Sequence, residues 1–233
     1  MAWFYAVAYE VGEPSPYRLQ QLFQPDQIYR KEGKPTSSGA WNKYRLGMRL
    51  PMTGVDTDGR RCIATAVGIQ YADTLAVLEH PLWKAMAEKT LPIRDIAAAV
   101  KRLPRSEAHY YRDLSAVRSG TYEMDIIEAA GNKIWVNIGD YMGAFNHFAI
   151  HLMLLRVDTV RLDLRVQPRM AKNIGRLLGF VAEVPWIHPF YIELFDWMDA
   201  NVWGDLFKWI DLPGVQRGWR RTASLWITTP TAR

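Results

Sequence analysis

Cysteine is almost absent from this sequence: Cys62 is the only one among 233 residues. An intramolecular disulfide is therefore impossible, and a zinc site built from four cysteines is excluded for the same reason. The chain cannot be a small secreted scaffold held together by disulfides. The scarcity of cysteine agrees with a reducing compartment, and we predict a cytoplasmic protein.

Long hydrophobic runs are also missing. The longest uncharged segment, 141–155, is shorter than the roughly 20 apolar residues that a helix needs to span a bilayer. This segment also contains the polar residues Asn146, His147 and His151. The N-terminus is rich in aromatic residues, has no basic region and does not resemble a signal peptide. We therefore expect a soluble protein with no membrane partner.

Motifs for covalent catalysis and for cofactor binding are lacking too. The sequence has no Gly-x-Ser-x-Gly elbow and no glycine-rich phosphate loop. His147 and His151 are four residues apart, so one face of a helix could present both to a metal ion. The residues between them do not include the glutamate of a His-Glu-x-x-His motif. The sequence therefore favours a buried histidine pair over a metal site, and we predict no enzymatic activity and no cofactor.

The composition is that of a folded protein, with 49% hydrophobic and 23% charged residues. A chain of this length forms one large domain or two small ones, with a sizeable core. Proline or serine at helix starts and apolar stripes at helical spacing predict a mainly α, multi-helical fold. The predicted helices cover residues 16–23, 41–49, 60–67, 73–79, 81–89, 92–103, 106–118, 121–130, 140–156 and 168–181. The first of these has Ser15 as its N-cap and Pro16 at its first position, and Gly68 is the predicted C-cap of the helix 60–67.

Two segments fit either a strand or a helix. Residues 1–11 place large apolar side chains at alternating positions, but the intervening residues are apolar as well. Residues 160–166 alternate apolar and charged, which is typical of a strand, although the preceding helix could extend through them. Residues 24–37 are polar and rich in turn formers, and predict a loop.

The pair Gly131-Asn132 predicts the boundary between two domains. Residues 1–130 would then form a helical domain, and residues 131–233 a mainly helical domain rich in tryptophan.

Positive charge gathers around one short segment. The formal net charge of the chain is +5, which favours anionic partners such as nucleic acid. In residues 37–51, two serines offer a helix N-cap, Gly47 can close the helix and Pro51 ends the segment. Helical signals and a cluster of cations coincide here.

The end of this segment resembles the recognition helix and following turn of lambda-repressor-like (Xre/Cro-type) helix-turn-helix proteins. The matching residues are Tyr44, Gly47, Arg49 and Pro51. Residues 63–69 are similar to the helix that the family places after this turn, so the resemblance covers residues 15–70. It implies a helix-turn-helix-like part in which Tyr44 packs in the core and a basic residue approaches phosphate. The sequence departs from the family at Arg45, where an acidic residue is usual, and in the long link between residues 17–23 and Tyr44.

The side chains on and after this predicted helix suit contacts with DNA. Asparagine and arginine can hydrogen-bond to adenine and guanine edges, while lysine and arginine also neutralise phosphate. The predicted duplex-binding residues are Asn42, Lys43, Arg45, Arg49, Arg60 and Arg61. The alternative is that Trp41 and Tyr44 anchor the segment in the core and the basic residues form a solvated helix face.

The C-terminal part is rich in tryptophan, since six of the ten tryptophans follow residue 185. Carboxylates dominate residues 184–211, where Lys208 is the only lysine or arginine, and acidic surroundings repel a nucleic-acid backbone. An aromatic core or an interface between copies therefore explains these tryptophans better than a stacking platform does. A second basic face is predicted on the helix 168–181, from Arg169, Lys172 and Arg176.

The sequence therefore predicts a DNA-binding protein, regulatory in type and of bacterial or mobile-element origin, that contacts the duplex through a short basic helix. Its tryptophan-rich half is predicted to join copies into a homo-oligomer. The alternative function is a non-enzymatic interaction or scaffold module that acts through that half.

Overall fold

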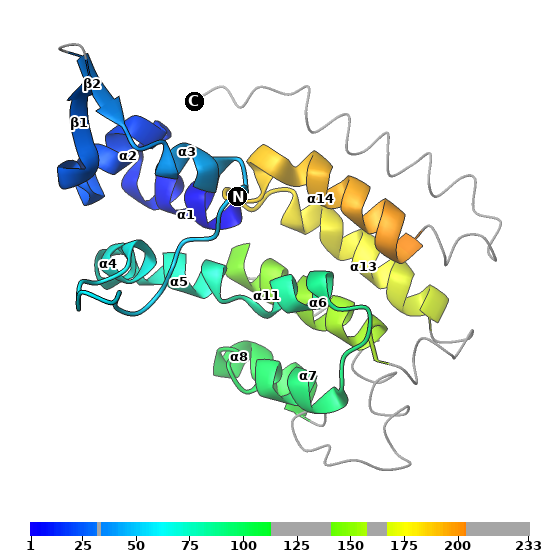
Figure 1. Cartoon of the computed structure of the whole chain (residues 1–233). Coiled ribbons are helices and arrows are strands. Elements are labelled where there is room, and N and C mark those ends of the chain that lie inside the picture. Colours follow the sequence, from blue (N-terminus) through cyan, green and yellow to red (C-terminus); the bar gives the residue numbers. More distant parts are fainter. Residues whose placement is uncertain (32–33, 113–140, 158–166, 204–233) are drawn as a thin grey trace. The chain divides into compact units, whose positions relative to one another are not determined.

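The computed structural model describes residues 1–31, 34–112, 141–157 and 167–203, and it is mainly helical, as the sequence predicts (Figure 1). The chain divides into two compact units. Unit 1 comprises Met1–His80 and Pro185–Phe190, and unit 2 comprises Pro81–Val184 and Tyr191–Arg233. Among the described helices, none is both long enough and apolar enough to cross a membrane.

Unit 1 consists of short helices joined by turns, with one β-hairpin. Its elements are α1 (Ala2–Val11), α2 (Pro16–Phe23), the 3-10 turn η1 (Pro25–Gln27), β1 (Ile28–Lys31), β2 (Lys34–Ser37), α3 (Ala40–Arg45), α4 (Ile63–Gln70), α5 (Ala72–Leu78) and the 3-10 turn η3 (His188–Phe190). The predicted start of α2 is confirmed: Pro16 follows the N-cap Ser15, whose hydroxyl accepts a hydrogen bond from the Arg18 N–H at 3.4 Å.

The N-terminal segment, for which the sequence leaves strand and helix open, is the helix α1. Apolar residues occur on most of its sides, which suits a helix that is largely buried. Trp3, Phe4 and Val7 are all buried. The helix ends at Gly12, which has a φ of 72° and whose N–H donates to the Tyr9 carbonyl.

An aromatic cluster from α1, α2 and α3 forms the core of unit 1. Trp41 is fully buried, with its ring centroid 5.5 Å from that of Trp3, 5.8 Å from Phe23 and 6.1 Å from Tyr44. Its indole N–H donates to Gln24 Oε1 at 3.1 Å. These contacts fix the orientation of α3 about its own axis.

The segment Pro185–Phe190 completes unit 1 from a distant part of the sequence. The Phe190 ring stacks on Tyr5 with a centroid distance of 6.1 Å, and Trp186 packs edge-on against Tyr9 at the same distance. Unit 1 is therefore discontinuous in sequence, which the sequence pattern does not reveal.

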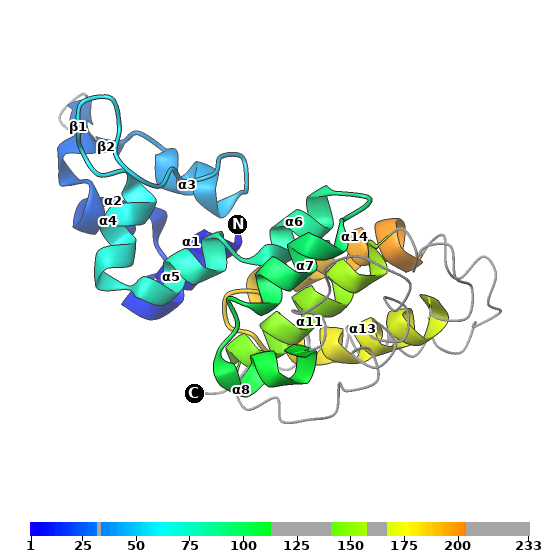
Figure 2. The ribbon, with the colours of Figure 1, turned by 90° about the horizontal axis from the view of Figure 1, so that it is seen from below.

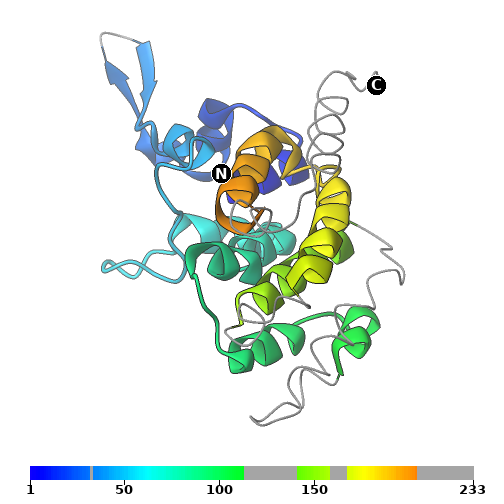
Figure 3. The same cartoon turned by 90° about the vertical axis from the view of Figure 1, so that its right-hand side faces the viewer.

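Residues 24–37 contain the β-hairpin, so the prediction of a loop there is wrong. The two strands are antiparallel, with Ile28 opposite Ser37 and Tyr29 opposite Thr36. Isoleucine, tyrosine and threonine have high strand propensity, a signal that the neighbouring turn residues obscure. Figures 1 and 3 show the hairpin projecting away from α2 and α3.

Helix α4 begins at Ile63 instead of residue 60 and continues past Gly68, so this glycine is not the predicted C-cap. Gly68 lies inside the helix, where an added Cβ would be 2.3 Å from Leu75 Cδ1. The position requires glycine because α4 and α5 approach each other closely there.

We expect Gly68→Ala to destabilise unit 1 by about 1–2 kcal/mol, because overlap with Leu75 outweighs the higher helix propensity of alanine. Urea denaturation followed by circular dichroism measures the change. The matched control is Gly179→Ala in α13 (Gln167–Val181), where an added Cβ meets no atom of another segment within 4 Å. This control should be neutral or stabilising by up to about 1 kcal/mol. Equal effects of the two substitutions would contradict the close contact of α4 with α5.

Unit 2 is built around α11 (Tyr141–Leu155), which is buried along almost its whole length, as the sequence predicts. Helices α6, α7 and α13 all pack against α11 (Figure 2). The apolar face predicted for residues 168–181 is confirmed by the burial of Ile174, Leu177 and Val181. The other elements of unit 2 are α6 (Pro81–Ala87), α7 (Ile93–Val100), α8 (Arg105–Ala108), η2 (His109–Tyr111), α14 (Tyr191–Met198) and the π-helical turn η4 (Asp199–Trp203).

The predicted domain boundary at Gly131-Asn132 lies outside the described residues, as do the helix at 121–130 and the strand-like segment 160–166. The sequence predicts domains 1–130 and 131–233, whereas the two compact units adjoin in sequence at His80–Pro81, Val184–Pro185 and Phe190–Tyr191. The physical reason is that α11 buries its apolar surface against α6 and α7, which come from the other side of the predicted boundary.

Candidate functional site

Helix α3 exposes polar side chains because its aromatic residues are buried. It is shorter than the predicted helix 41–49, and Trp41 and Tyr44, three positions apart, share its buried face. Asn42 and Lys43 are exposed. The structure therefore has the two core anchors of the alternative interpretation, Trp41 and Tyr44, and it leaves Asn42 and Lys43 exposed, as both interpretations require.

The start of α3 differs from the expected serine cap. Gly39 is the N-cap, with a φ of 71°, and the preceding Ser38 Oγ accepts from the Ala40 N–H at 3.3 Å. The Gln20 side chain donates to Ser38 Oγ at 3.1 Å and to the Gln27 carbonyl at 3.2 Å. Ser38 therefore links the hairpin to α2, and a glycine takes the cap position.

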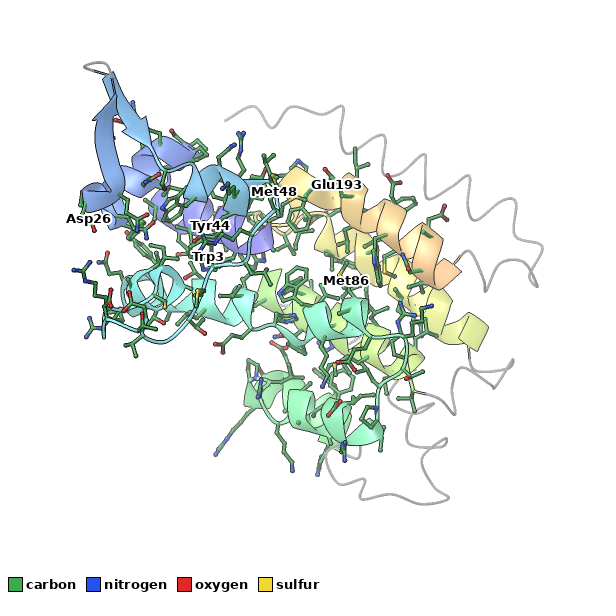
Figure 4. All side chains as sticks on the ribbon, in the orientation of Figure 1. Trp3, Asp26, Tyr44, Met48, Met86 and Glu193 are labelled. Carbon is green, nitrogen blue, oxygen red and sulfur yellow. The ribbon has the colours of Figure 1, made fainter. Side chains whose placement is uncertain are left out.

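The end of α3, near the labelled Tyr44 and Met48 in Figure 4, follows the predicted glycine pattern. Gly47 has a φ of 70°, its N–H donates to the Tyr44 carbonyl at 3.1 Å, and the Met48 N–H donates to the Lys43 carbonyl at 2.9 Å. The exposed Arg49 follows this turn. Burial raises the pKa of the Tyr44 hydroxyl, and the positive charge of Arg49 opposes part of that rise. The charge of Arg49 therefore acts close to α3.

Arg45 is less exposed than its predicted role requires. It follows Trp41 by four residues, which places it near the buried side of α3, and its side chain is half-buried. Its Nε is buried and has no hydrogen-bond partner within the described part of the chain. Of the predicted residues on α3, Asn42 and Lys43 are thus the better placed for a ligand.

Arg60 and Arg61 lie on the loop before α4 and not at the start of the helix as expected. The Asp56 carboxylate shapes this loop by accepting from the Asp58 and Arg60 N–H groups at 3.0 and 2.8 Å. Val55 and Arg61 form an isolated antiparallel bridge. Both arginine side chains are exposed.

Carboxylates are scarce in the part of the sequence that contains these cations. Residues 28–61 contain eight lysines and arginines against three acidic residues, and no acidic residue falls between Glu32 and Asp56. Within the described ranges, none of the five predicted DNA-binding cations forms an ion pair. Their charge is therefore open to an anionic ligand.

The element order of unit 1 differs from a tight helix-turn-helix. Helices α2 and α3 pack against each other, but the hairpin separates them in sequence. The long link that the sequence shows before Tyr44 is thus an ordered pair of strands, and its basic residues belong to the same unit. These are Arg30, Lys31 and Lys34.

Sequence reasoning missed a group of exposed apolar side chains after α3, which we call the apolar strip. Each member exposes between 49% and 75% of its surface. The members are Leu46, Met48, Leu50, Met52 and Val55. A signal was present, because apolar residues alternate here with glycine, arginine and proline in a stretch too irregular to form a core helix or strand.

The predicted second basic face lies on α13, in unit 2. The spacing of Arg169, Lys172 and Arg176 places the three residues along one side of this helix. Their side chains are not among those that the structure describes. The six residues predicted to bind DNA all belong to unit 1.

His147 and His151 are buried in α11. The Tyr111 hydroxyl hydrogen-bonds to His147 Nδ1, and His151 Nδ1 donates to the His147 carbonyl at 2.7 Å. Burial lowers the pKa of His147 to about 4, so its imidazole is neutral at pH 7. The Asn146 amide donates to the Glu107 carboxylate at 2.8 Å, and these bonds tie α11 to α8 and η2. The described residues include no group of three or more histidine, cysteine or acidic side chains placed to hold a metal ion.

Two of the C-terminal tryptophans have described side chains, and both make contacts inside their own unit. Trp186 is buried in unit 1. Trp197 is half-buried in unit 2, where the Arg156 guanidinium lies 5.5 Å from its ring centroid. The other four tryptophan side chains after residue 185 lie outside the description: Trp203, Trp209, Trp219 and Trp226.

Comparison with known protein-family models, curated proteins and solved structures finds no match to this chain. The chemistry of the site itself is therefore the guide to its function. The basic, carboxylate-poor surface of α3 and the loop after it is the strongest candidate site.

Proposed function

We propose that unit 1 binds duplex DNA through α3 and the loop that follows it. The supporting observation is that Lys43, Arg49, Arg60 and Arg61 are exposed cations with no ion pair among the described residues. A surface of this kind attracts a polyanion and gains free energy from the release of condensed counterions.

The buried aromatic residues give this surface its rigidity. Because Trp41 and Tyr44 hold α3 in the core, Asn42 and Lys43 face solvent on a fixed backbone. Binding through them therefore avoids the conformational-entropy cost of ordering a mobile loop. Asn42 can hydrogen-bond to a base edge, and Lys43 and Arg49 can contact flanking phosphates.

In this proposal the protein is a non-enzymatic regulator, of bacterial or mobile-element origin, that works in the cytoplasm. Self-association through the tryptophan-rich half would place two copies of unit 1 on one duplex. The second candidate function, a scaffold that acts through that half, has less support because Trp186 and Trp197 make contacts within their own units.

Arg49→Ala is expected to weaken binding to every duplex sequence alike and to lower the slope of log K against log salt by about 1, because one phosphate contact is lost. Asn42→Ala should leave that slope unchanged and reduce discrimination between sequences by about 1–3 kcal/mol. Fluorescence anisotropy with labelled duplexes at several salt concentrations measures both effects.

The control is Arg102→Ala, which removes an exposed cation from unit 2 and should leave affinity and slope as in the parent protein. If the parent protein shows no affinity for mixed-sequence duplex at low salt, the proposed function is wrong. Equal losses in the Arg49 and Arg102 variants would show that overall charge, and not the α3 surface, drives binding.

A further inference from the structure

We propose that the apolar strip is a wedge that inserts between base pairs of the bound duplex and bends it. This inference rests on the proposed DNA binding, and it adds how the duplex is held and which base steps are preferred. Apolar side chains that enter the minor groove and unstack a base step are a known way for a protein to kink DNA.

The large exposed apolar surface of the strip indicates that it binds a ligand. Met48 and Leu50 expose 72% and 75% of their surface, more than any other large hydrophobic side chain in the described ranges. Single exposed apolar residues are common on folded proteins, but a contiguous group marks an interaction surface. Here five such residues fall within positions 46–55.

Cations flank the strip on both sides along the sequence. They precede it on α3, interrupt it at Arg49 and follow it on the loop before α4; the members are Lys43, Arg45, Arg49, Arg60 and Arg61. A complementary ligand is therefore anionic at its rim and apolar at its centre. A duplex has this composition, because phosphates line its grooves and flat base-pair faces become accessible where a step is unstacked.

An anionic bilayer has a similar composition, but the backbone of the strip disfavours it. The N–H groups of Arg49, Leu50 and Met52 donate no hydrogen bond within the described residues. Acyl chains offer no acceptor for such groups, so inserting this irregular segment into hydrocarbon carries a large penalty. Phosphate and sugar oxygens do accept hydrogen bonds from backbone N–H groups. The duplex is therefore the better occupant.

A wedge predicts a preference for deformable DNA. Pyrimidine–purine steps such as TA unstack and kink easily, whereas A-tracts are stiff. The full chain should therefore bind a duplex with a central TA step about ten-fold more tightly than one with a central A-tract, and should bend it by on the order of 20–90°.

The test uses the full chain and duplexes of about 30 base pairs that carry a dye pair at their ends, so that bending raises energy transfer. The parent protein should raise energy transfer on the TA duplex. The double variant Met48→Ser with Leu50→Ser should still bind the A-tract duplex within about three-fold of the parent, because its cations remain. It should lose both the rise in energy transfer and the preference for TA.

The matched control is Leu22→Ser with Ile69→Ser, which removes two exposed apolar side chains elsewhere in unit 1 and should behave like the parent. Binding of the parent without bending or TA preference overturns the wedge and leaves the proposed function standing. No binding to either duplex overturns both. Partition onto phosphatidylserine vesicles that depends on Met48 and Leu50, without DNA bending, identifies a bilayer as the occupant and overturns the wedge.

Discussion

Trp41→Ala is expected to lower the free energy of unfolding of unit 1 by about 3–5 kcal/mol, the usual cost of removing a buried tryptophan. The side chain is fully buried and contacts the rings of Trp3, Phe23 and Tyr44. It also donates a hydrogen bond to Gln24, whose carbonyl oxygen would lose its partner. Domains are stable by only about 5–15 kcal/mol, so this loss removes a large fraction of the free energy of unfolding. The variant should therefore unfold at a much lower urea concentration than the parent.

Urea denaturation with far-UV circular dichroism and hydrogen exchange of unit 1 measures this loss. Trp41→Phe is the matched control, since it keeps an aromatic ring in the cluster and removes the indole donor, and should cost about 1–2 kcal/mol. A change below about 1 kcal/mol for the alanine variant would contradict the burial of Trp41 and, with it, the orientation assigned to α3.

The stability of unit 2 is expected to fall by about 3 kcal/mol as the pH drops from 7 to 4, through His147. Burial lowers the pKa of this histidine from its ordinary value of 6.5 to about 4 in the folded state. Between these two values the unfolded chain binds a proton that the folded chain does not. The contribution is therefore fully present above pH 6.5 and is lost as the pH falls toward 4, at up to about 1.4 kcal/mol per pH unit.

His147→Asn separates this effect from the titration of carboxylates. The asparagine carbonyl can still accept a hydrogen bond from the Tyr111 hydroxyl, but it does not titrate. Denaturation of both proteins at a series of pH values should therefore show a shallower dependence in the variant between pH 6.5 and 4. The same slope in both proteins would mean that His147 is not buried in its neutral form. Burial also raises the pKa of the Tyr111 hydroxyl, so this partner stays protonated throughout the range.

Local signals predict much of this fold. The proline and serine before α2, the apolar stripe of α13 and the uncharged run of α11 each reflect a preference that the segment carries in itself. The turn at Gly47, after α3, is likewise predicted by the local sequence, because only a residue that readily adopts positive φ fits that turn.

Other features depend on distant partners, and the sequence could not show them. The role of Gly68 is set by Leu75 of the next helix, and the half-burial of Arg45 by the aromatic cluster that fixes the rotation of α3. The hairpin lies between these two cases, since strand propensity is present at Ile28 and Tyr29 but depends on a pairing partner. Among the candidate site residues, the types and approximate places follow from sequence, whereas their exposure follows only from packing.

The discontinuous composition of unit 1 affects how the chain is made. A ribosome that has finished residues 1–80 has not yet synthesised Trp186 and Phe190, whose rings pack against Tyr9 and Tyr5 of α1. Those aromatic surfaces therefore remain open while most of unit 2 emerges from the exit tunnel. Most of unit 1 is thus synthesised before unit 2, but the unit is completed only when residues 185–190 follow, and the nascent chain can form wrong contacts during that interval.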